Sequence, residues 1–229
     1  MPNPDGDKPT LGIYQLVVDS QGRYVMPGYK CEGGWSAALS ACESVITRVM
    51  PNGAWDTTFG TAGAGKLGYS ALTFGTTTNT NTQAFWATTF DASGNLVAVG
   101  WDEGYTTATL ARFDGTTGAL DTTFGTSGRV TPVLVSGGSG QQLDDVAVDE
   151  DGRIIAAGYA SSGGPLALVT RYSAAGVLDT TYGTNGVGST PSAGVSPRML
   201  LQPDGRIVVV GASPRGTSGY DVALWRFWP

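Results

Sequence analysis

The chain has 229 residues, of which 14% are charged and 41% are hydrophobic, and its formal net charge is −6. Disordered chains combine high charge with low hydrophobicity, so this composition predicts a folded protein. The acidic balance and the absence of a Lys/Arg run argue against nucleic acid or an anionic membrane surface as a partner. No apolar run approaches the length of a membrane-spanning helix, so no membrane insertion is expected.

The chain starts with MPNPDGDKPT, which has neither the basic region nor the apolar region of a signal peptide, so we expect no signal peptide within this chain. Cys31 and Cys42 follow in CEGGWSAALSAC, where Gly33 and Gly34 allow a tight return. With no histidine and no second cysteine pair, a standard zinc site is excluded. A local disulfide is the simplest interpretation, and two reduced core cysteines are the alternative. A disulfide in a chain rich in Gly, Thr and Ser predicts a secreted or cell-surface protein.

A hexapeptide recurs three times farther along the chain, as WDTTFG (55–60), LDTTFG (120–125) and LDTTYG (178–183). Each copy follows a strand-like stretch that ends in arginine and an apolar residue. Hairpin signals interleave with these stretches, and each centres on a turn glycine between two β-branched runs. The turn glycines are Gly22, Gly94, Gly152 and Gly205. The second run of each hairpin is apolar without alternation, which predicts a strand buried on both faces.

Four short antiparallel strands repeated every ~50–70 residues are typical of a propeller blade, because solenoid repeats are shorter. We therefore predict an all-β fold, a four-repeat β-propeller-like array of short antiparallel sheets. Residues 1–229 should form a single repeat domain. Its approximate repeats are 11–60, 61–125, 126–183 and 184–229.

The block ARFDGTTGALDTTFGTSGRV, the hairpin AVDEDGRIIAAGY and the stretch VALWRF together resemble the delta-60 repeat. The resemblance extends over nearly the whole chain. It departs in the first repeat, where the cysteine loop and the segment TTTNTNTQ (76–83) are inserted. It implies propeller-like blades and a place in secreted or surface bacterial proteins, and it implies no well-defined activity.

Two charged positions recur with the repeat. Arginine occupies the first position and aspartate the second, at Arg48, Arg112, Arg171 and Arg226, and at Asp56, Asp121 and Asp179. The offset of eight or nine residues across a turn predicts a cross-strand Arg–Asp pair in each blade. A ring of arginines that binds an anion is the alternative, but repetition in every blade favours the structural interpretation.

Aromatic residues also recur. Phe59, Phe124 and Tyr182 are expected to pack between sheets. Tyr29, Trp101 and Tyr159 each follow a strand-ending glycine, and they either pack between blades or form a face for ligand stacking.

Several motifs resemble functional sites without meeting their requirements. GTAGAGKL (60–67) matches a phosphate-binding loop, but Leu67 stands where Ser or Thr should hold magnesium. DEDGR (149–153) lacks the further ligands and distal glutamate of an EF-hand, so we expect an Asp-rich turn. Asp149 and Asp151 are nevertheless calcium candidates. The chain has no histidine, so the commonest general base is missing. We predict no enzyme and no cofactor.

Function in repeat proteins resides in features that differ between repeats. Three segments differ here: the cysteine loop, residues 73–86 and residues 100–107. Their aromatic and hydrogen-bonding side chains suit a carbohydrate or a protein epitope. These candidate ligand-binding residues are Trp35, Phe85, Trp86, Trp101, Asp102 and Tyr105.

We therefore predict a non-catalytic extracellular recognition or adhesion module that binds a cell-surface glycan or protein. The alternatives are a structural spacer or assembly module of a larger surface protein, and a carbohydrate-active enzyme.

The last repeat reaches Arg226 without a following hexapeptide. Propellers commonly close by letting one terminus complete the blade begun by the other. We predict that residues about 5–14 lie beside residues 222–228, with Asp5 or Asp7 near Arg226.

Overall fold

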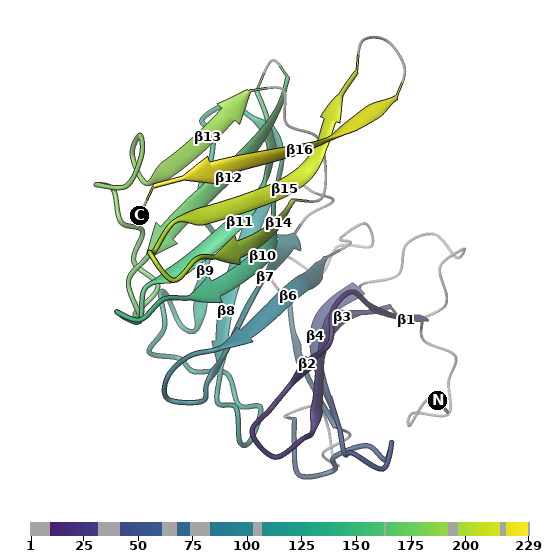
Figure 1. Cartoon of the computed structure of the whole chain (residues 1–229). Helices are drawn as coiled ribbons and strands as arrows, with labels where there is room; N and C mark the ends of the chain where they lie inside the picture. Colours follow the sequence, from purple (N-terminus) through teal and green to yellow (C-terminus); the bar gives the residue numbers. More distant parts are fainter. Residues whose placement is uncertain are drawn as a thin grey trace.

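The structure is a computed structural model, and it describes residues 10–31, 42–60, 68–73, 83–102, 107–162, 164–191, 197–215 and 219–228. In these ranges the regular elements are all strands, arranged in four antiparallel sheets that follow one another along the chain (Figure 1). The predicted all-β, propeller-like fold is confirmed. The described part of the chain holds no helix long and apolar enough to cross a membrane.

The first sheet, blade 1, has the order β1 (Thr10–Ile13), β3 (Tyr24–Cys31), β4 (Cys42–Val49) and β5 (Tyr69–Leu72). A short strand, β2 (Val17–Val18), pairs with the start of β3, while β1 pairs with its end. Together β1 and β2 therefore act as the first strand of the blade.

The remaining blades repeat this arrangement. Blade 2 is β6 (Ala84–Phe90), β7 (Leu96–Asp102), β8 (Thr107–Phe113) and β9 (Arg129–Val130). Blade 3 is β10 (Ser139–Val148), β11 (Ile154–Ser161), β12 (Pro165–Tyr172) and β13 (Val187–Pro191). Blade 4 is β14 (Arg198–Leu201), β15 (Ile207–Pro214) and β16 (Tyr220–Phe227).

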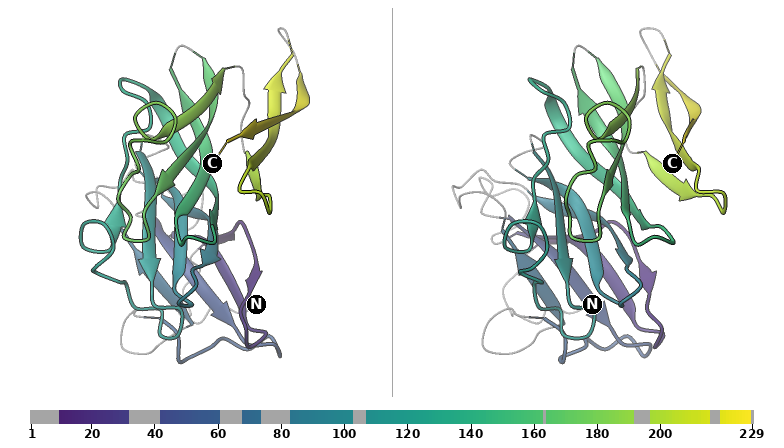
Figure 2. Two further views of the ribbon diagram at one scale, coloured as in Figure 1. Left: turned by 60° about the vertical axis from the view of Figure 1, so that its left-hand side comes forward. Right: turned by 90° about the vertical axis from the view of Figure 1, so that its left-hand side faces the viewer.

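The predicted pairing of the N-terminal segment with residues 222–228 is wrong for the described residues. Thr10–Ile13 pairs with Gly28–Cys31, because the hairpin around Gly22 brings this partner close along the chain. Asp5 and Asp7 lie outside the described residues. The first and fourth blades, purple and yellow, lie at the two ends of the array (Figures 1 and 2).

The hexapeptides form turns, and the fourth strand of blades 1 to 3 follows its hexapeptide. The sheets therefore end later along the chain than the expected repeat boundaries, which were drawn at the hexapeptides. Asp56 stabilises the turn of the first hexapeptide, because its Oδ1 accepts hydrogen bonds from the backbone amide (3.0 Å) and hydroxyl (2.6 Å) of Thr58. Asp121 with Thr123, and Asp179 with Thr181, repeat this arrangement.

Neighbouring blades pack face to face through one hydrophobic core each. We call the face toward the next blade along the chain the forward face, the opposite face the rear face, and the contact between them a joint. Val25 and Ile46 on the forward face of blade 1 cluster with Phe85 and Leu96 of blade 2. The second strands of blades 2 and 3 are buried on both faces, as predicted, because each serves two joints. The same prediction is wrong for β15 of blade 4, where Val210 is 39% exposed because no described blade covers its forward face.

Candidate functional site

The first joint contains the most buried arginine of the chain. Nε of Arg48 donates to Oδ2 of Asp56 at 2.8 Å, so the expected Arg–Asp pair is present. The rest of the guanidinium reaches into blade 2, where Nη1 donates to the carbonyl of Gly115 (2.6 Å) and Nη2 to that of Thr116 (2.8 Å). The guanidinium carbon also lies 4.2 Å from the ring centre of Phe59. One side chain thus links its own blade to the turn of the next blade.

The second joint repeats the link. Arg112 pairs with Asp121 at 2.7 Å, and its Nη1 donates to the carbonyl of Ala174 in blade 3 (2.6 Å). In blade 3, Arg171 pairs with Asp179, also at 2.7 Å. Hydrogen bonds from Thr181 and Arg171 lower the pKa of Asp179 to about 2. These guanidiniums are engaged with protein groups, so the geometry matches the structural interpretation of the repeated arginines.

A turn glycine closes each of these joints. The backbone amide of Gly60 donates to the carbonyl of Thr117 (2.9 Å), and that of Gly125 donates to the carbonyl of Ala175 (2.8 Å). Gly118 has a φ of +76°, and a Cβ built on it would lie 3.0 Å from Phe59. The hexapeptide aromatic therefore packs directly against the turn of the next blade, as expected for a residue between sheets.

The forward face of blade 4 and the first-strand part of the rear face of blade 1 carry exposed apolar side chains, whereas the side chains on the rear side of β4 are buried, namely Val45, Thr47 and Val49. Among the described residues, all but two of the exposed large hydrophobic side chains belong to blades 1 and 4. Val222 is 86% exposed and Leu224 is 66% exposed on β16, and Val18 is 55% exposed on β2. We call these two surfaces the end faces. The alternating apolar residues of YDVALWRF and of TLGIYQLVV were a signal for them, since half of each set needs a covering layer.

Three of the four predicted ligand-binding residues that the structure describes are buried. Phe85 has no exposed surface and belongs to the core of the first joint, while Trp101 and Asp102 are buried at the end of β7. These three predictions are wrong as surface contacts, because the aromatic rings fill space between blades. Trp86 is half-buried and stacks on Tyr14, with ring centres 4.0 Å apart.

Trp35 and Tyr105 lie outside the described residues, as does most of residues 73–86. At the other aromatic repeat positions, Tyr29 packs at 5.8 Å against Tyr14, and Tyr159 is half-buried.

The calcium candidates are paired with an arginine. Oδ2 of Asp149 accepts from Nε of Arg153 at 2.6 Å, and Oδ2 of Asp151 lies 3.0 Å from Nη2 of the same side chain. The guanidinium thus occupies the place that a cation would need. Across the ranges that the structure describes, no group of three acidic, cysteine or histidine side chains could hold a metal ion.

A buried acidic pair on β10 was not selected as a site from the sequence. Asp144 is fully buried, and burial raises its pKa to about 7, although Nε2 of Gln142 donates to it at 2.7 Å. Burial also raises the pKa of Asp145, whose Oδ2 accepts from the amide of Met199 in blade 4 at 2.7 Å. Arg198 donates to the carbonyl of Asp144. The pair therefore lies at the joint between blades 3 and 4.

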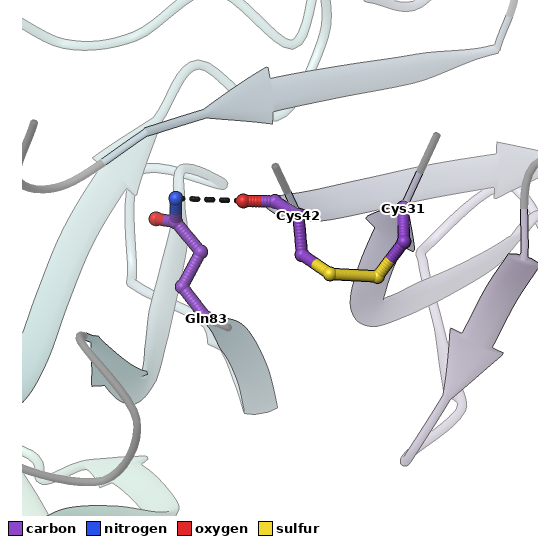
Figure 3. Close-up of a disulfide and its surroundings, with 3 residues drawn as sticks. All are labelled: Cys31, Cys42 and Gln83. Atoms are coloured by element: carbon purple, nitrogen blue, oxygen red, sulfur yellow. Dashed lines mark hydrogen bonds between the residues drawn. A yellow bond between two sulfur atoms is a disulfide. The ribbon is translucent and has the colours of Figure 1, made fainter. Parts of the chain in front are cut away.

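The predicted disulfide between Cys31 and Cys42 is present (Figure 3). The two cysteines are directly opposite each other on β3 and β4. Nε2 of Gln83 donates to the carbonyl of Cys42 at 2.8 Å, which ties this edge of blade 1 to the residue that precedes blade 2.

Two segments of the chain, residues 150–182 and 202–229, match the family model of a domain of unknown function, the DUF5122 beta-propeller. In these segments the chain is similar to DUF5122. They contain the central hairpins of blades 3 and 4 and the third hexapeptide, so the DUF5122 match covers repeat features described above. No curated protein matches the sequence at a significant level.

Solved structures show the same fold at low identity. A protein of unknown function from Dyadobacter fermentans is 13% identical, with a TM-score of 0.52, over 91% of this chain and 58% of its own. An exo-beta-1,3-galactanase from Phanerochaete chrysosporium, with beta-1,3-galactotriose, is 11% identical, with a TM-score of 0.50, over 94% of this chain and 46% of its own. This chain thus spans about half the length of the galactanase. At these identities the likeness shows the fold alone.

Proposed function

We propose that the chain is a non-catalytic assembly module of a secreted or cell-surface protein. In this proposal its end faces join further blades of the same delta-60 type. The observation that carries the proposal is the exposure of Leu224. The equivalent residues of the three preceding blades, which share its register with the second strand, have no exposed surface: Ile46, Leu110 and Val169.

The hydrophobic effect favours covering the forward face of blade 4. Fully burying a valine or leucine side chain stabilises a protein by about 1.5–3 kcal/mol. Val222 and Leu224 lie beside Val210 and Leu200, which are exposed as well, so the forward face of blade 4 is a contiguous apolar surface. Contiguous exposed apolar surfaces mark interaction sites. A covering blade would recover the stabilisation that the interior joints already have.

The glycan-recognition alternative has less support. It depended on exposed aromatic rings, and the rings of Phe85 and Trp101 are buried. The disulfide between Cys31 and Cys42 supports an extracellular location, because such bonds persist in oxidising compartments.

An extended chain tests the proposal. In the sheet register Phe227 is equivalent to Phe113, so a copy of residues 114–191 grafted after Phe227 would continue the repeat with a fourth strand and one further blade. We expect the melting temperature to rise and the amides of β15 and β16 to exchange more slowly with deuterium. Leu224→Asp in the extended chain should remove both gains. If the extension leaves blade 4 as exchangeable as before, the end face does not accept a blade.

A further inference from the structure

We propose that the free end faces of this chain bind each other in a head-to-tail pair, in which blade 1 of a second copy covers blade 4. This inference rests on the proposed function and names its partner. The interior joints are made of one forward face and one rear face. The chain carries one more of each, with exposed apolar side chains at Val222 and Leu224 on the forward face and at Ile13 and Val18 on the rear face.

One position on the rear face recurs in every blade. It is the last residue of the first strand, which pairs with the first residue of the second strand. In blades 2, 3 and 4 this residue packs against the core of a joint, as Phe90, Val148 and Leu201. Its equivalent in blade 1 is Val18, which pairs with Tyr24 and is 55% exposed. Blade 1 thus presents an apolar side chain at a position that every other blade partly buries against the core of a joint.

A second position on the rear face is also buried in blades 2 and 3 and exposed in blade 1. Phe85 and Leu143 lie opposite the glycine of the second strand in blades 2 and 3, and both have no exposed surface. The equivalent residue in blade 1 is Ile13, opposite Gly28, and it is 40% exposed.

The forward face of blade 4 also carries Arg226, whose counterparts in blades 1 and 2 donate hydrogen bonds to the next blade. Arg226 lies opposite Val208, as Arg48 lies opposite Val25 and Arg112 opposite Val97, and it is exposed. Arg48 and Arg112 donate to carbonyls in the turn of the following blade.

Blade 1 has the corresponding turn. Pro51 and Asn52 occupy the places of Gly115 and Thr116, and both are exposed. Gly53 stands for Gly118 and Gly176, but no atom lies within 4 Å of a Cβ built on it, whereas Phe59 and Phe124 approach those two glycines. This turn is open where its counterparts are covered by a preceding blade.

A symmetric contact between two forward faces is less favourable. It would bring two copies of Arg226 to one interface and leave Ile13 and Val18 uncovered. A forward face against a rear face covers both sets, and it gives each guanidinium a turn with backbone carbonyl acceptors. Such a heterologous contact either closes into a ring or continues as a chain. Two copies that satisfy both joints would form a ring of eight blades.

Sedimentation velocity of the purified full chain tests the pair. We expect wild-type protein to associate in a concentration-dependent way. Leu224→Asp should remove the forward half and Val18→Asp the rear half, so each variant alone should sediment as a monomer. The two variants mixed in equal amounts should form a one-to-one dimer, because one intact joint remains between them. Val133→Asp is the matched control, since Val133 is 72% exposed but lies on neither end face, and it should associate like wild type.

The outcomes separate this inference from the proposed function. Persistent association of Val18→Asp would overturn the head-to-tail pair in favour of contact between forward faces, and association of Leu224→Asp would indicate contact between rear faces. Monomeric wild-type protein would overturn the second copy as partner, and the extended chain described above would still test whether the end face accepts a blade. Circular dichroism of each variant checks that its sheets remain folded.

Discussion

Replacing Arg48 with alanine tests whether the arginine links hold neighbouring blades together. The change removes the nearer arginine partner of Asp56, two hydrogen bonds to the carbonyls of blade 2 and the contact with the ring of Phe59. Both side chains of the ion pair are buried. Nη1 of Arg23 remains 3.6 Å from Oδ2 of Asp56. The carboxylate would keep its bonds from Thr58, which maintain part of its stabilisation.

The expected loss in free energy of unfolding can be estimated from these contacts. Removing one partner of a buried ion pair costs about 3–5 kcal/mol. The carbonyls of Gly115 and Thr116 are only partly buried, so losing their donor costs a further ~0.5–1.5 kcal/mol. The lost contact with the aromatic ring adds ~0.5–2 kcal/mol. With the remaining bonds to Asp56 deducted, we expect a loss of about 4–6 kcal/mol. In a chain of this size that corresponds to a melting temperature lower by roughly 10–20 °C.

Urea unfolding followed by circular dichroism measures this loss. Arg171→Ala is the matched control, because Arg171 pairs with a more exposed aspartate and no bond from it to blade 4 is among the described contacts. We expect its loss to be clearly smaller. Equal losses for the two variants, or a loss below about 1 kcal/mol for Arg48→Ala, would refute the view that the link between blades supplies the stability.

Three further predictions concern other parts of the joints. Breaking the bond between Cys31 and Cys42 by a double serine substitution should lower the free energy of unfolding by about 2–3 kcal/mol, and unreduced wild-type protein should show no alkylatable thiol by intact mass. The pKa of Asp144 is about 7 in the folded protein against 3.8 as its ordinary value, so the native state binds more protons between these values and stability should fall as the pH rises through them. The fall should amount to roughly 4 kcal/mol, and Asp144→Asn should flatten it in urea titrations at a series of pH values. Phe124→Ala should cost about 3–5 kcal/mol because its buried ring packs against Gly176; near-native stability by differential scanning calorimetry would contradict this packing.

The repeated architecture could be predicted from the sequence because its signals are local. The hexapeptide, the turn glycines and the apolar second runs each specify a turn or strand within a few residues. The pairing of Arg48 with Asp56 followed from their spacing for the same reason. The carbonyl partners of Arg48 could not be predicted, because they lie 67 and 68 residues away and have no side-chain signature.

The burial of Phe85 and Trp101, two of the candidate ligand-binding residues, could not be predicted, for a physical reason. An aromatic residue at the end of a strand suits a binding platform or a core equally well, and only the position of the next sheet decides between them. Trp101 and Phe85 became core residues because another blade packs over their strands. The end faces could not be predicted for the opposite reason. The apolar residues of β16 have the sequence pattern of a buried strand, but no described blade covers their forward face.

The repeated arginine and glycine bonds between blades terminate on main-chain atoms. Arg48 and Arg112 donate to carbonyl oxygens, and the amide of Gly60 does the same. The receiving turns consequently need only the right backbone shape, and their sequences DGTTGA and SAAGV differ at most positions. A newly duplicated repeat therefore meets an acceptable neighbour without compensating substitutions across the joint. Gene duplication can lengthen or shorten such an array by whole repeats, while point mutations accumulate in the turns at positions other than Gly118 and Gly176.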